Sequence, residues 1–495
     1  MSKVPCTLSR LPLMRHDTDV VVLGGGLAGL RAALAARLAH PGCRVSVVTA
    51  RCGPAGSSFA NPNNALGMQV CRTDADREAF VREVVGLAAP GSVTPELVEV
   101  LAAESLERFS DLKALGVRFD REPGADTEGA VGCFSPTSHR AALVRNLPPL
   151  FAAFRNRLDS LGVAWLPDWL VATLLADANG RVRGALLLSR DASHALALRA
   201  ATTVVALGGP APLFARHLAG PGNPGYGLGL LHRVGASLVN PGYLQFFWST
   251  LPDRTYFSPE AAFAADFGLA TDKGFVHPLA DYPRQHLAEL AAERATHCPC
   301  AYARPDALLD AALAGQAGPD GIVQVSRQGH ALSLALFAHA GNGGAAIDAW
   351  GRTNVPGLYA AGECAGGMHG ANRLGGGMVT ATQVFGARAG RAAAEESTAG
   401  TPLPPDRFTE LAKEALAALP HDPAARARGL DRLGRDLSRA VTPFPDPERA
   451  SLRRILLRER SRPTDWWLDL CCETALALGE DRSDGATGPA SDQSL

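Results

Sequence analysis

The feature that most constrains the fold is a glycine-rich turn between a predicted strand and a predicted helix near the N-terminus. Residues 19–50 read DVVVLGGGLAGLRAALAARLAHPGCRVSVVTA, so a β-branched run precedes the glycines and a helix-forming segment follows them. A second β-branched run, RVSVVTA, ends the segment, which predicts a βαβ unit with two buried strands. Gly24, Gly26 and Gly29 have the G-x-G-x-x-G spacing. Between a strand and a helix, this spacing predicts dinucleotide binding.

Each glycine of this motif has its own predicted role. Gly24 makes the tight turn, Gly26 lets a pyrophosphate approach the helix N-terminus, and Gly29 lets the helix pack on the strand. The alternative is a glycine-rich turn that binds nothing. The second strand ends at Thr49, where an acidic residue would favour NAD by bonding the ribose hydroxyls. A threonine hydroxyl can still bond a ribose, so dinucleotide binding stays the prediction, but the acid that would favour NAD is missing.

The length, net charge and apolar runs of the chain argue against several classes of protein. The chain has 495 residues, which predicts more than one domain, and its net charge of -1 gives no reason to expect a nucleic-acid partner. The sequence has no apolar run of about 18 residues and no signal-peptide pattern, so we expect no membrane insertion and a cytoplasmic location.

The ten cysteines are scattered along the chain, a pattern that favours free thiols over a disulfide framework. His297–Cys300 reads HCPC and could be half of a zinc site, but the one other cluster, Cys471–Cys472, completes it poorly. We therefore expect no metal and buried, inert thiols.

The remaining patterns predict an α/β chain of several parts. Helical periodicity covers about 74–119, short alternating runs cover about 166–205, and a strand ending in two glycines follows at Thr202–Gly209. Periodicity weakens from about Gln245 to Phe337, which suggests an inserted domain. We therefore expect a Rossmann-like domain at 17–243 and 339–398, an α+β capping domain at 244–338, a helical region at 399–480 and a disordered tail at 481–495.

Four separated motifs resemble the flavoprotein family of succinate dehydrogenase, fumarate reductase and L-aspartate oxidase. They are VVVLGGGLAGL, GPAGSSFANPNNA, VVALGG and HAGNGGAAIDAWGRTNVPGLYAAGECAGGMHGANRLGGG, and the resemblance covers about 17–395. Segment 80–120 and the SHR at Ser138–Arg140 are most similar to the aspartate oxidase branch. The resemblance implies FAD as cofactor, and Ser57 and Ser58 stand where some members attach it through histidine, so we expect non-covalent FAD.

The resemblance also implies roles for individual residues. Glu363 would bond hydroxyls of FAD, and the helix that begins after Leu374 would point at the flavin. Arg373 would hold a substrate carboxylate, with His339 binding a second polar group. The predicted cofactor residues are Gly24, Gly26, Leu27, Ala28, Gly29, Thr49, Gly56, Ser57, Ser58, Ala206, Gly208, Gly209, Glu363, Gly377, Met378 and Val379. Simpler alternatives are a structural Arg373 and a loop histidine at 339.

Some positions depart from the family pattern. Aligned on the motifs, Phe247 replaces a substrate-binding histidine, Phe134 a glutamate and Leu290 the proton-transferring arginine. The acid of a TGDG motif is replaced by Tyr226. Arg284 and Arg294 are nearby candidates for proton transfer. A buried charge without a partner is unfavourable, so a mono-carboxylate or a more apolar substrate fits these residues better than aspartate.

The sequence thus predicts an FAD-dependent oxidoreductase that transfers hydride between a carboxylate-bearing substrate and FAD. One alternative is a flavin-binding electron-transfer subunit of a larger complex, with an electron-carrier or iron–sulfur partner and no dicarboxylate chemistry of its own. The other is an NAD-dependent dehydrogenase, which Thr49 argues against.

Overall fold

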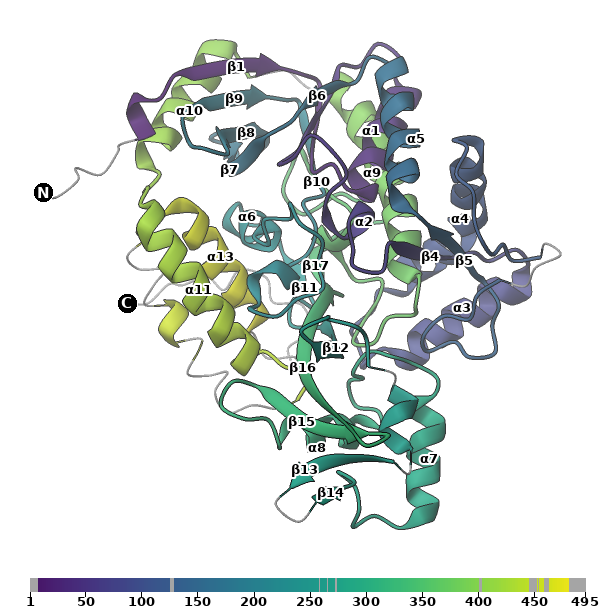
Figure 1. Cartoon of the computed structure of the whole chain (residues 1–495). Coiled ribbons are helices and arrows are strands. Elements are labelled where there is room, and N and C mark those ends of the chain that lie inside the picture. Colours follow the sequence, from purple (N-terminus) through teal and green to yellow (C-terminus); the bar gives the residue numbers. More distant parts are fainter. Residues whose placement is uncertain are drawn as a thin grey trace, which may run out of the picture.

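The computed structural model describes residues 8–124, 129–257, 259–264, 266–271, 274–399, 403–444, 452, 454–457 and 463–479. The predicted tail at 481–495 lies outside these residues. Figure 1 shows a large upper body built around a parallel sheet, with a smaller sheet and two helices projecting below it. In the part of the chain that is described, no helix combines the length and apolar character needed to cross a membrane.

A five-stranded parallel sheet forms the centre of the upper body. Its strand order is β18 (Leu358–Ala360), β10 (Thr202–Val205), β2 (Val20–Leu23), β3 (Val45–Val48) and β6 (Ala164–Leu166). The residues of β2, β3 and β10 are buried, as their β-branched sequences predict. The predicted βαβ unit is therefore present, and its strands carry the glycine turn.

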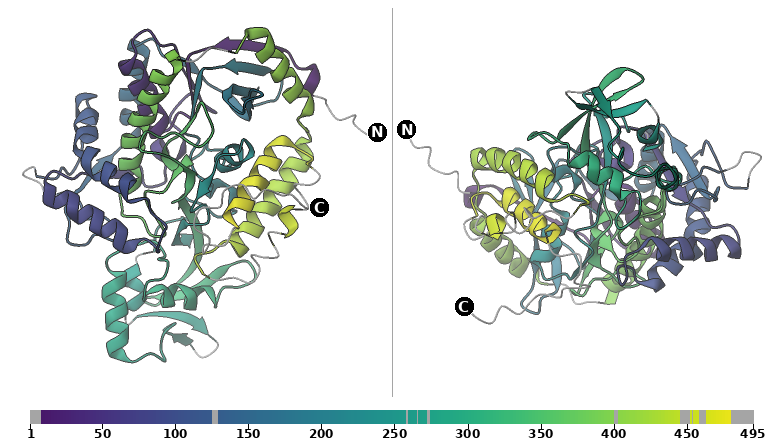
Figure 2. Two further views of the ribbon diagram at one scale, coloured as in Figure 1. Left: turned by 180° about the vertical axis from the view of Figure 1, so that it is seen from behind. Right: turned by 90° about the horizontal axis from the view of Figure 1, so that it is seen from below.

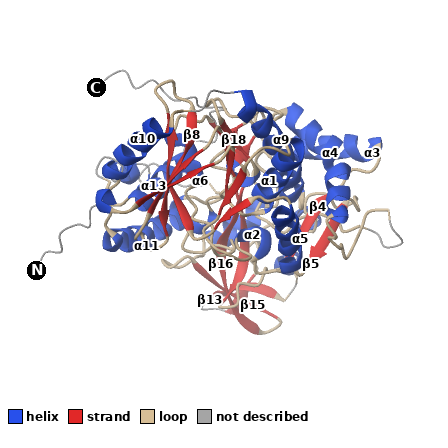
Figure 3. Cartoon of the chain, turned by 90° about the horizontal axis from the view of Figure 1, so that it is seen from above, coloured by secondary structure: helices blue, strands red, loops and turns tan. Residues whose placement is uncertain are grey.

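Two helices cover one face of this sheet side by side. They are α1 (Leu27–Ala39) and α9 (Gly377–Ala399), and Figures 1 and 3 show them in close contact. A Cβ at Gly390 would lie only 2.0 Å from the Ala32 carbonyl oxygen, so the backbones touch where a larger residue would separate them. This contact fixes the start of α9 relative to the start of α1.

The lower body is an antiparallel sheet with two helices. Its strand order is β12 (Leu244–Leu251), β16 (His330–Gly341), β15 (Ile322–Arg327), β13 (Phe267–Thr271) and β14 (Gly274–Val276). The helices are α7 (Arg284–Arg294) and α8 (Ala307–Ala314). β12 and β16 pair with each other and run back into the upper body, which places this sheet as a cap below the parallel sheet.

The other elements surround the central sheet, and Figure 2 shows them from behind and from below. α3 (Asp74–Leu87) and α4 (Pro95–Ala114) form the predicted helical region, and β7 (Trp169–Ala176), β8 (Val182–Ser189) and β9 (Ala195–Arg199) form the predicted antiparallel run, joined by β1 (Leu13–Asp17). α10 (Pro405–Ala418), α11 (Pro423–Ala440) and α13 (Trp466–Leu478) follow at the C-terminal end. The smaller elements are α2 (Gly56–Phe59), β4 (Ala65–Gln69), β5 (Ala141–Arg145), α5 (Leu147–Ser160), α6 (Gly227–Arg233), β11 (Leu238–Val239), β17 (Gly344–Ala346), β19 (Ala365–Gly366) and short 3-10 turns at Leu8–Arg10, Ala211–Leu213, Pro259–Phe263 and Gly362–Cys364.

The predicted fold class is confirmed: a Rossmann-like α/β domain carries an inserted α+β cap and a helical C-terminal region. The exact boundaries between these parts stay predictions.

Candidate functional site

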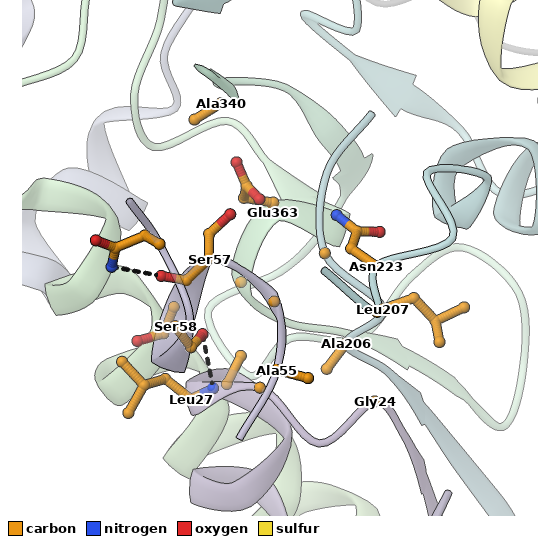
Figure 4. A pocket seen from close by; sticks show the side chains of 18 of the residues that line it. Gly24, Leu27, Ala55, Ser57, Ser58, Ala206, Leu207, Asn223, Ala340 and Glu363 are labelled. Carbon is orange, nitrogen blue, oxygen red and sulfur yellow. Dashed lines mark hydrogen bonds between the residues drawn. The ribbon is translucent and has the colours of Figure 1, made fainter. Parts of the chain in front are cut away.

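A single cavity of about 410 Å³ joins the glycine turn to the region between the two bodies. Its walls come from the start of α1, from α2, from the segments that follow β3 and β10, and from β12 and β16 of the cap. Figure 4 shows the part near α2, where Leu27, Ser58, Ala206 and Glu363 face one space. Ligands of open parallel sheets bind beyond the carboxyl ends of the strands, which is where this cavity begins.

The three motif glycines have the geometry that their predicted roles require. Gly24 has φ +121°, and a Cβ there would lie 2.1 Å from the Ala206 carbonyl oxygen. A Cβ at Gly29 would lie 1.9 Å from the Gly24 carbonyl oxygen, so Gly29 lies behind the turn and does not line the cavity. Gly26 is the residue before α1 and lines the cavity in an extended conformation. The turn therefore leaves bare backbone beside a helix N-terminus, as a pyrophosphate requires.

Two predicted serines lie against this helix start. The Leu27 backbone N–H donates a 3.1 Å hydrogen bond to the Ser58 hydroxyl, drawn in Figure 4. The Ser57 carbonyl accepts a 2.9 Å bond from the Asn61 side chain, and both serines line the cavity. Gly56, with φ +65°, is the first residue of α2, the short helix that contains both serines. The chain thus places hydroxyl groups where the resemblance expects the cofactor.

The ends of β3 and β10 supply further predicted cofactor residues. Thr49 lines the cavity, and its hydroxyl donates a 2.6 Å bond to the Arg51 carbonyl, which leaves the oxygen able to accept another bond. Ala206 and Gly208 line the cavity after β10, as does Ala28 at the start of α1. Gly209 is not in the wall but donates its N–H to a Glu363 side-chain oxygen at 3.0 Å.

Glu363 joins three segments of the chain at the cavity wall. Its carboxylate accepts hydrogen bonds from the Gly209 N–H at 3.0 Å and the Gly341 N–H at 3.1 Å. Burial raises the pKa of Glu363, and Arg373 opposes that shift. The carboxylate therefore both holds the β16 end in place and presents an acceptor to a ligand in the cavity.

The start of α9 forms another wall. Met378 and Val379 line the cavity, and Gly377, the first residue of the helix, lies just behind them. A helix N-terminus stabilises negative charge nearby, so this end of the cavity favours an anionic or electron-rich group.

Arg373 is a buried cation held by neutral side chains. Its Nε donates a 3.1 Å hydrogen bond to the Asn342 side-chain oxygen, and Nη2 donates to the Gln245 side-chain oxygen. Within the described residues no carboxylate is in ion-pair contact with it; Glu363 acts on it through longer-range charge only. Burial lowers the pKa of Arg373 to about 10, which leaves it charged at neutral pH. An unpaired buried charge is costly, and an anionic ligand in the cavity would relieve that cost.

His339 faces the same cavity from β16. Its ring contacts Phe247 edge to face at 4.9 Å, and Tyr256 stacks on Phe247 at 4.7 Å. The buried Nδ1 atom has no hydrogen-bond partner among the described residues. Burial and the charge of Arg373 lower the pKa of His339 to about 3, so the imidazole is neutral at neutral pH. A neutral imidazole can donate one bond and accept another, and one of its nitrogens is available to a ligand.

The low pKa of His339 makes folding depend on pH. Between the ordinary value of 6.5 and about 3, the unfolded chain binds a proton at His339 that the folded chain does not, so stability falls as pH drops through this range. We expect the free energy of unfolding of the wild type to fall more steeply than that of His339→Gln, by up to about 1.4 kcal/mol per pH unit. Denaturant titrations between pH 6.5 and 3.5 measure both slopes, and equal slopes would mean that His339 titrates normally.

The two arginines predicted to transfer protons lie elsewhere. Arg284 is at the exposed start of α7 and does not line the cavity. Arg294 is buried inside the cap, where it forms ion pairs with Asp310 and, at 3.1 Å, with Asp306. The structure does not bring either side chain to Arg373 and His339, so the proton-transfer role stays a prediction without geometric support.

The side chains around Arg294 include a group of atoms that could ligate a metal ion. Glu293, His297 and Asp306 place one ligand atom each within 4.8 Å of one another, which is the one such group found in the described residues. Arg294 already lies 3.1 Å from the Asp306 carboxylate and supplies positive charge there. Cys298 and Cys300 of the HCPC segment are not part of this group: Cys298 lines the cavity and Cys300 is buried beside Asp310.

The structure places the four positions that depart from the family pattern in different surroundings. Phe247 lies in the cavity wall, as the alignment expects, and Tyr226 also lines it. Phe134 does not line the cavity: it has φ +64° and stacks on His297 at 4.2 Å. Leu290 is buried in the cap and does not line the cavity either. Two of the three aligned apolar positions are therefore outside the wall.

Several residues in the cavity wall or bonded to it were not expected from the sequence. Gln245 and Asn342 fix the Arg373 side chain through hydrogen bonds. Cys133 and Cys298 line the cavity from the two bodies, and Tyr256 supplies a phenol. The HCPC motif predicts buried, inert thiols, but Cys298 is exposed and lines the cavity, whereas Cys300 is buried.

Comparison with known proteins identifies the family. The FAD binding domain family matches residues 19–271 and 301–379. The chain is 33% identical to the L-aspartate oxidase of Caulobacter vibrioides over 431 residues, 81% of each chain, and 27% identical to a fumarate reductase (CoM/CoB) subunit of Methanothermobacter marburgensis, over 77% of this chain and 73% of that one. Among solved structures it resembles Mycobacterium smegmatis Sdh1 in complex with UQ1, with a TM-score of 0.76, 22% identity and coverage of 94% and 86%. A quinol–fumarate reductase with menaquinol molecules gives a TM-score of 0.72 at 19% identity, with coverage of 94% and 90%.

These matches agree with the geometry of the glycine turn and the cavity. The expected resemblance is confirmed, and the NAD-dependent alternative is not supported. The chain belongs to the FAD-binding flavoprotein family of L-aspartate oxidase and fumarate reductase, and it is an FAD-dependent oxidoreductase.

Proposed function

We propose that the protein oxidises or reduces a small carboxylate whose carboxylate group is held by Arg373 beside non-covalently bound FAD. The observation that carries the proposal is the buried Arg373 cation, which faces the cavity and forms no ion pair with a described residue. A guanidinium fork binds a carboxylate bidentately, and the same geometry suits no uncharged ligand as well.

The residues around the cavity fit FAD. Bare backbone at Gly24 and Gly26 lies beside the α1 N-terminus, where a pyrophosphate would bind. The Glu363 carboxylate and the Ser57 hydroxyl face the cavity, which Met378 and Val379 at the α9 N-terminus also line. When bound, FAD supplies the two-electron hydride chemistry. Serines at 57 and 58 cannot form the histidyl linkage that some relatives use, so the binding is non-covalent.

The chain's own groups would bind and orient the substrate. Arg373 pairs with the carboxylate, and Gln245 and Asn342 hold the guanidinium in one orientation. The neutral His339 offers a hydrogen bond to a second polar group near the reacting carbon. Phe247 and Tyr256 exclude water on that side. Fixed dipoles and charges in a dry site act strongly on the charge that develops during reaction.

The polarity of the wall limits the rest of the substrate. Among the described lining residues the cations are Arg373 and Arg51, and Arg51 follows Thr49 at the β3 end. A second carboxylate near Phe247 would therefore lack a cation. We propose a mono-carboxylate, or a carboxylate with an apolar remainder, in preference to the aspartate named for the L-aspartate oxidase relatives.

The partner and the location are part of the proposal. The fumarate reductase relative is named as a subunit, which supports an electron-carrier or iron–sulfur partner that would reoxidise the flavin. We place the protein in the cytoplasm because its scattered cysteines suit a reducing compartment. The competing function is an electron-transfer subunit that holds FAD and acts on no carboxylate.

An anaerobic absorbance titration tests the proposal. Purified yellow protein is mixed with aspartate, succinate, mono-carboxylic amino acids and hydroxy acids, and dithionite-reduced protein is mixed with fumarate and other enoates. We expect one mono-carboxylate or apolar carboxylate to bleach or restore the flavin band. Bleaching by aspartate would contradict the substrate preference inferred from the Phe247 wall. A flavin that no carboxylate reduces or reoxidises would favour the electron-transfer subunit.

A further inference from the structure

Two cysteines from different bodies of the molecule meet in the cavity. Cys133 belongs to the loop before β5, in the upper body, and Cys298 belongs to the loop after α7, in the cap. They are 165 residues apart in the sequence, and both line the cavity that contains Arg373. The side chain and backbone of Cys298 lie close enough to the Cys133 sulfur to act on its pKa.

One backbone hydrogen bond and one ring contact beside the pair join the loops that carry the two cysteines. The Phe134 N–H donates a 2.8 Å hydrogen bond to the Thr296 carbonyl, and the Phe134 ring stacks on His297. On the other side, the Gly375 N–H donates a 2.9 Å bond to the Cys133 carbonyl, which ties Cys133 to the loop of Arg373. The loop of Cys133 is thus held beside the loop of Cys298 by contacts that do not involve the thiols.

From this juxtaposition we propose that Cys133 and Cys298 are a redox-active pair that closes to a disulfide across the cavity and fixes the cap on the FAD-binding body. Disulfides form between sulfurs that the fold already holds close, and a bridge between two bodies restricts their relative motion. The oxidant is a small-molecule disulfide of the glutathione type.

The exchange proceeds in two balanced steps. The Cys133 thiolate attacks one sulfur of the small disulfide, so a mixed disulfide forms and one small thiolate leaves. Cys298 then loses its proton to that thiolate and attacks the Cys133 sulfur, which breaks the mixed disulfide and releases the second small thiolate. The protein loses two electrons and the small disulfide gains two. The first step is favoured because hydrogen bonding to Cys298 lowers the pKa of Cys133 to about 6, against the effect of burial.

The exposure of the two thiols allows the same exchange reaction to reduce the bridge again. Cys298 is exposed, and Cys133 is half-buried at the cavity wall, so a small thiol can reach the bridge. The other thiols lie in different settings: Cys71, Cys300, Cys364 and Cys471 are buried, and burial raises their pKa. Selective oxidation of one pair is therefore expected.

The test uses the full-length protein with its bound FAD. Fully reduced protein is equilibrated with mixtures of oxidised and reduced glutathione, quenched with an alkylating agent and digested. We expect two fewer alkylated thiols and a linked peptide that contains Cys133 and Cys298, both reversed by excess reduced glutathione. Amide exchange over residues 284–299 should slow by about tenfold or more in the bridged protein.

Three variants make the test specific. Cys133→Ser and the exposed-site variant Cys298→Ser should each abolish the linked peptide and the slowed exchange. Cys52→Ser, at an exposed thiol that does not line the cavity, should retain both. A bridge that joins other cysteines, a terminal mixed disulfide with glutathione on Cys298, or a Cys133–Cys298 bridge without slowed exchange would overturn the proposal. None of these measurements depends on the identity of the carboxylate substrate.

Discussion

Arg373→Met should retain FAD and lose turnover by at least about two orders of magnitude, because a charge-assisted bidentate contact to the substrate is removed. The unpaired guanidinium stabilises nothing in the described structure by ion pairing. The variant without substrate should therefore be as stable as the wild type, or more stable, since the cost of burying a charge disappears. Steady-state kinetics and thermal unfolding, each with the flavin content measured, check both expectations.

Matched variants separate a binding role from a structural one. Arg373→Lys keeps the charge but loses the fork, so it should recover only part of the activity. Arg391→Met removes an exposed arginine of α9, paired with Glu395, and should leave turnover unchanged. A carboxylate that raises the melting temperature of the wild type should not raise that of Arg373→Met. Near-normal turnover in Arg373→Met would refute the carboxylate clamp.

Gly26→Val should fold normally and bind FAD about 10- to 100-fold more weakly, as overpacking of a fitted site predicts. Gly26 has a backbone conformation open to any residue, with φ -79° and ψ 179°, and a Cβ there would meet only the Ser58 hydroxyl, at 3.3 Å. The valine methyls would instead occupy the space in front of the α1 N-terminus. Flavin fluorescence titration of the apoprotein measures the affinity, and far-UV circular dichroism measures the fold.

Two other glycines serve as controls for this variant. A Cβ at Gly42 meets nothing within 4 Å, so Gly42→Ala should change neither affinity nor fold. A Cβ at Gly29 would overlap the Gly24 carbonyl, so Gly29→Val should fail in folding, not only in binding. Full affinity in Gly26→Val would show that no ligand approaches the helix at this point.

The parts of the site that could be predicted are those encoded in local sequence. Gly24 requires a positive φ, and both Gly24 and Gly29 make backbone contacts that only glycine permits, so the spacing of these two residues can be predicted from the sequence. Arg373 and His339 lie in continuous motifs that follow one another along the chain in the order of the family that the sequence resembles. Both side chains line the cavity, together with Glu363 and most of the predicted cofactor residues.

The parts that could not be predicted depend on loop conformation and on contacts distant in sequence. Counting back from SHR places Phe134 in the site, but its left-handed backbone turns the ring toward His297 and leaves Cys133 in the wall. Arg294 follows Leu290 by four residues, so both lie on the buried face of α7. The acids that pair with Arg294 are Asp306, the residue before α8, and Asp310, within α8. These buried ion pairs hold Arg294 away from the cavity.

β16 gives the cap a mechanical link to the site. This strand pairs with β15 at its beginning and with β12 over most of its length. Near its end, His339 and Ala340 line the cavity, and Gly341 is its last residue. Gly341 is in turn held by Glu363. Because β16 is continuous from the cap sheet to the cavity, a tilt of the cap sheet moves the His339 imidazole relative to Arg373. Substitutions far out on β13 or β15 can therefore alter substrate affinity without touching the substrate.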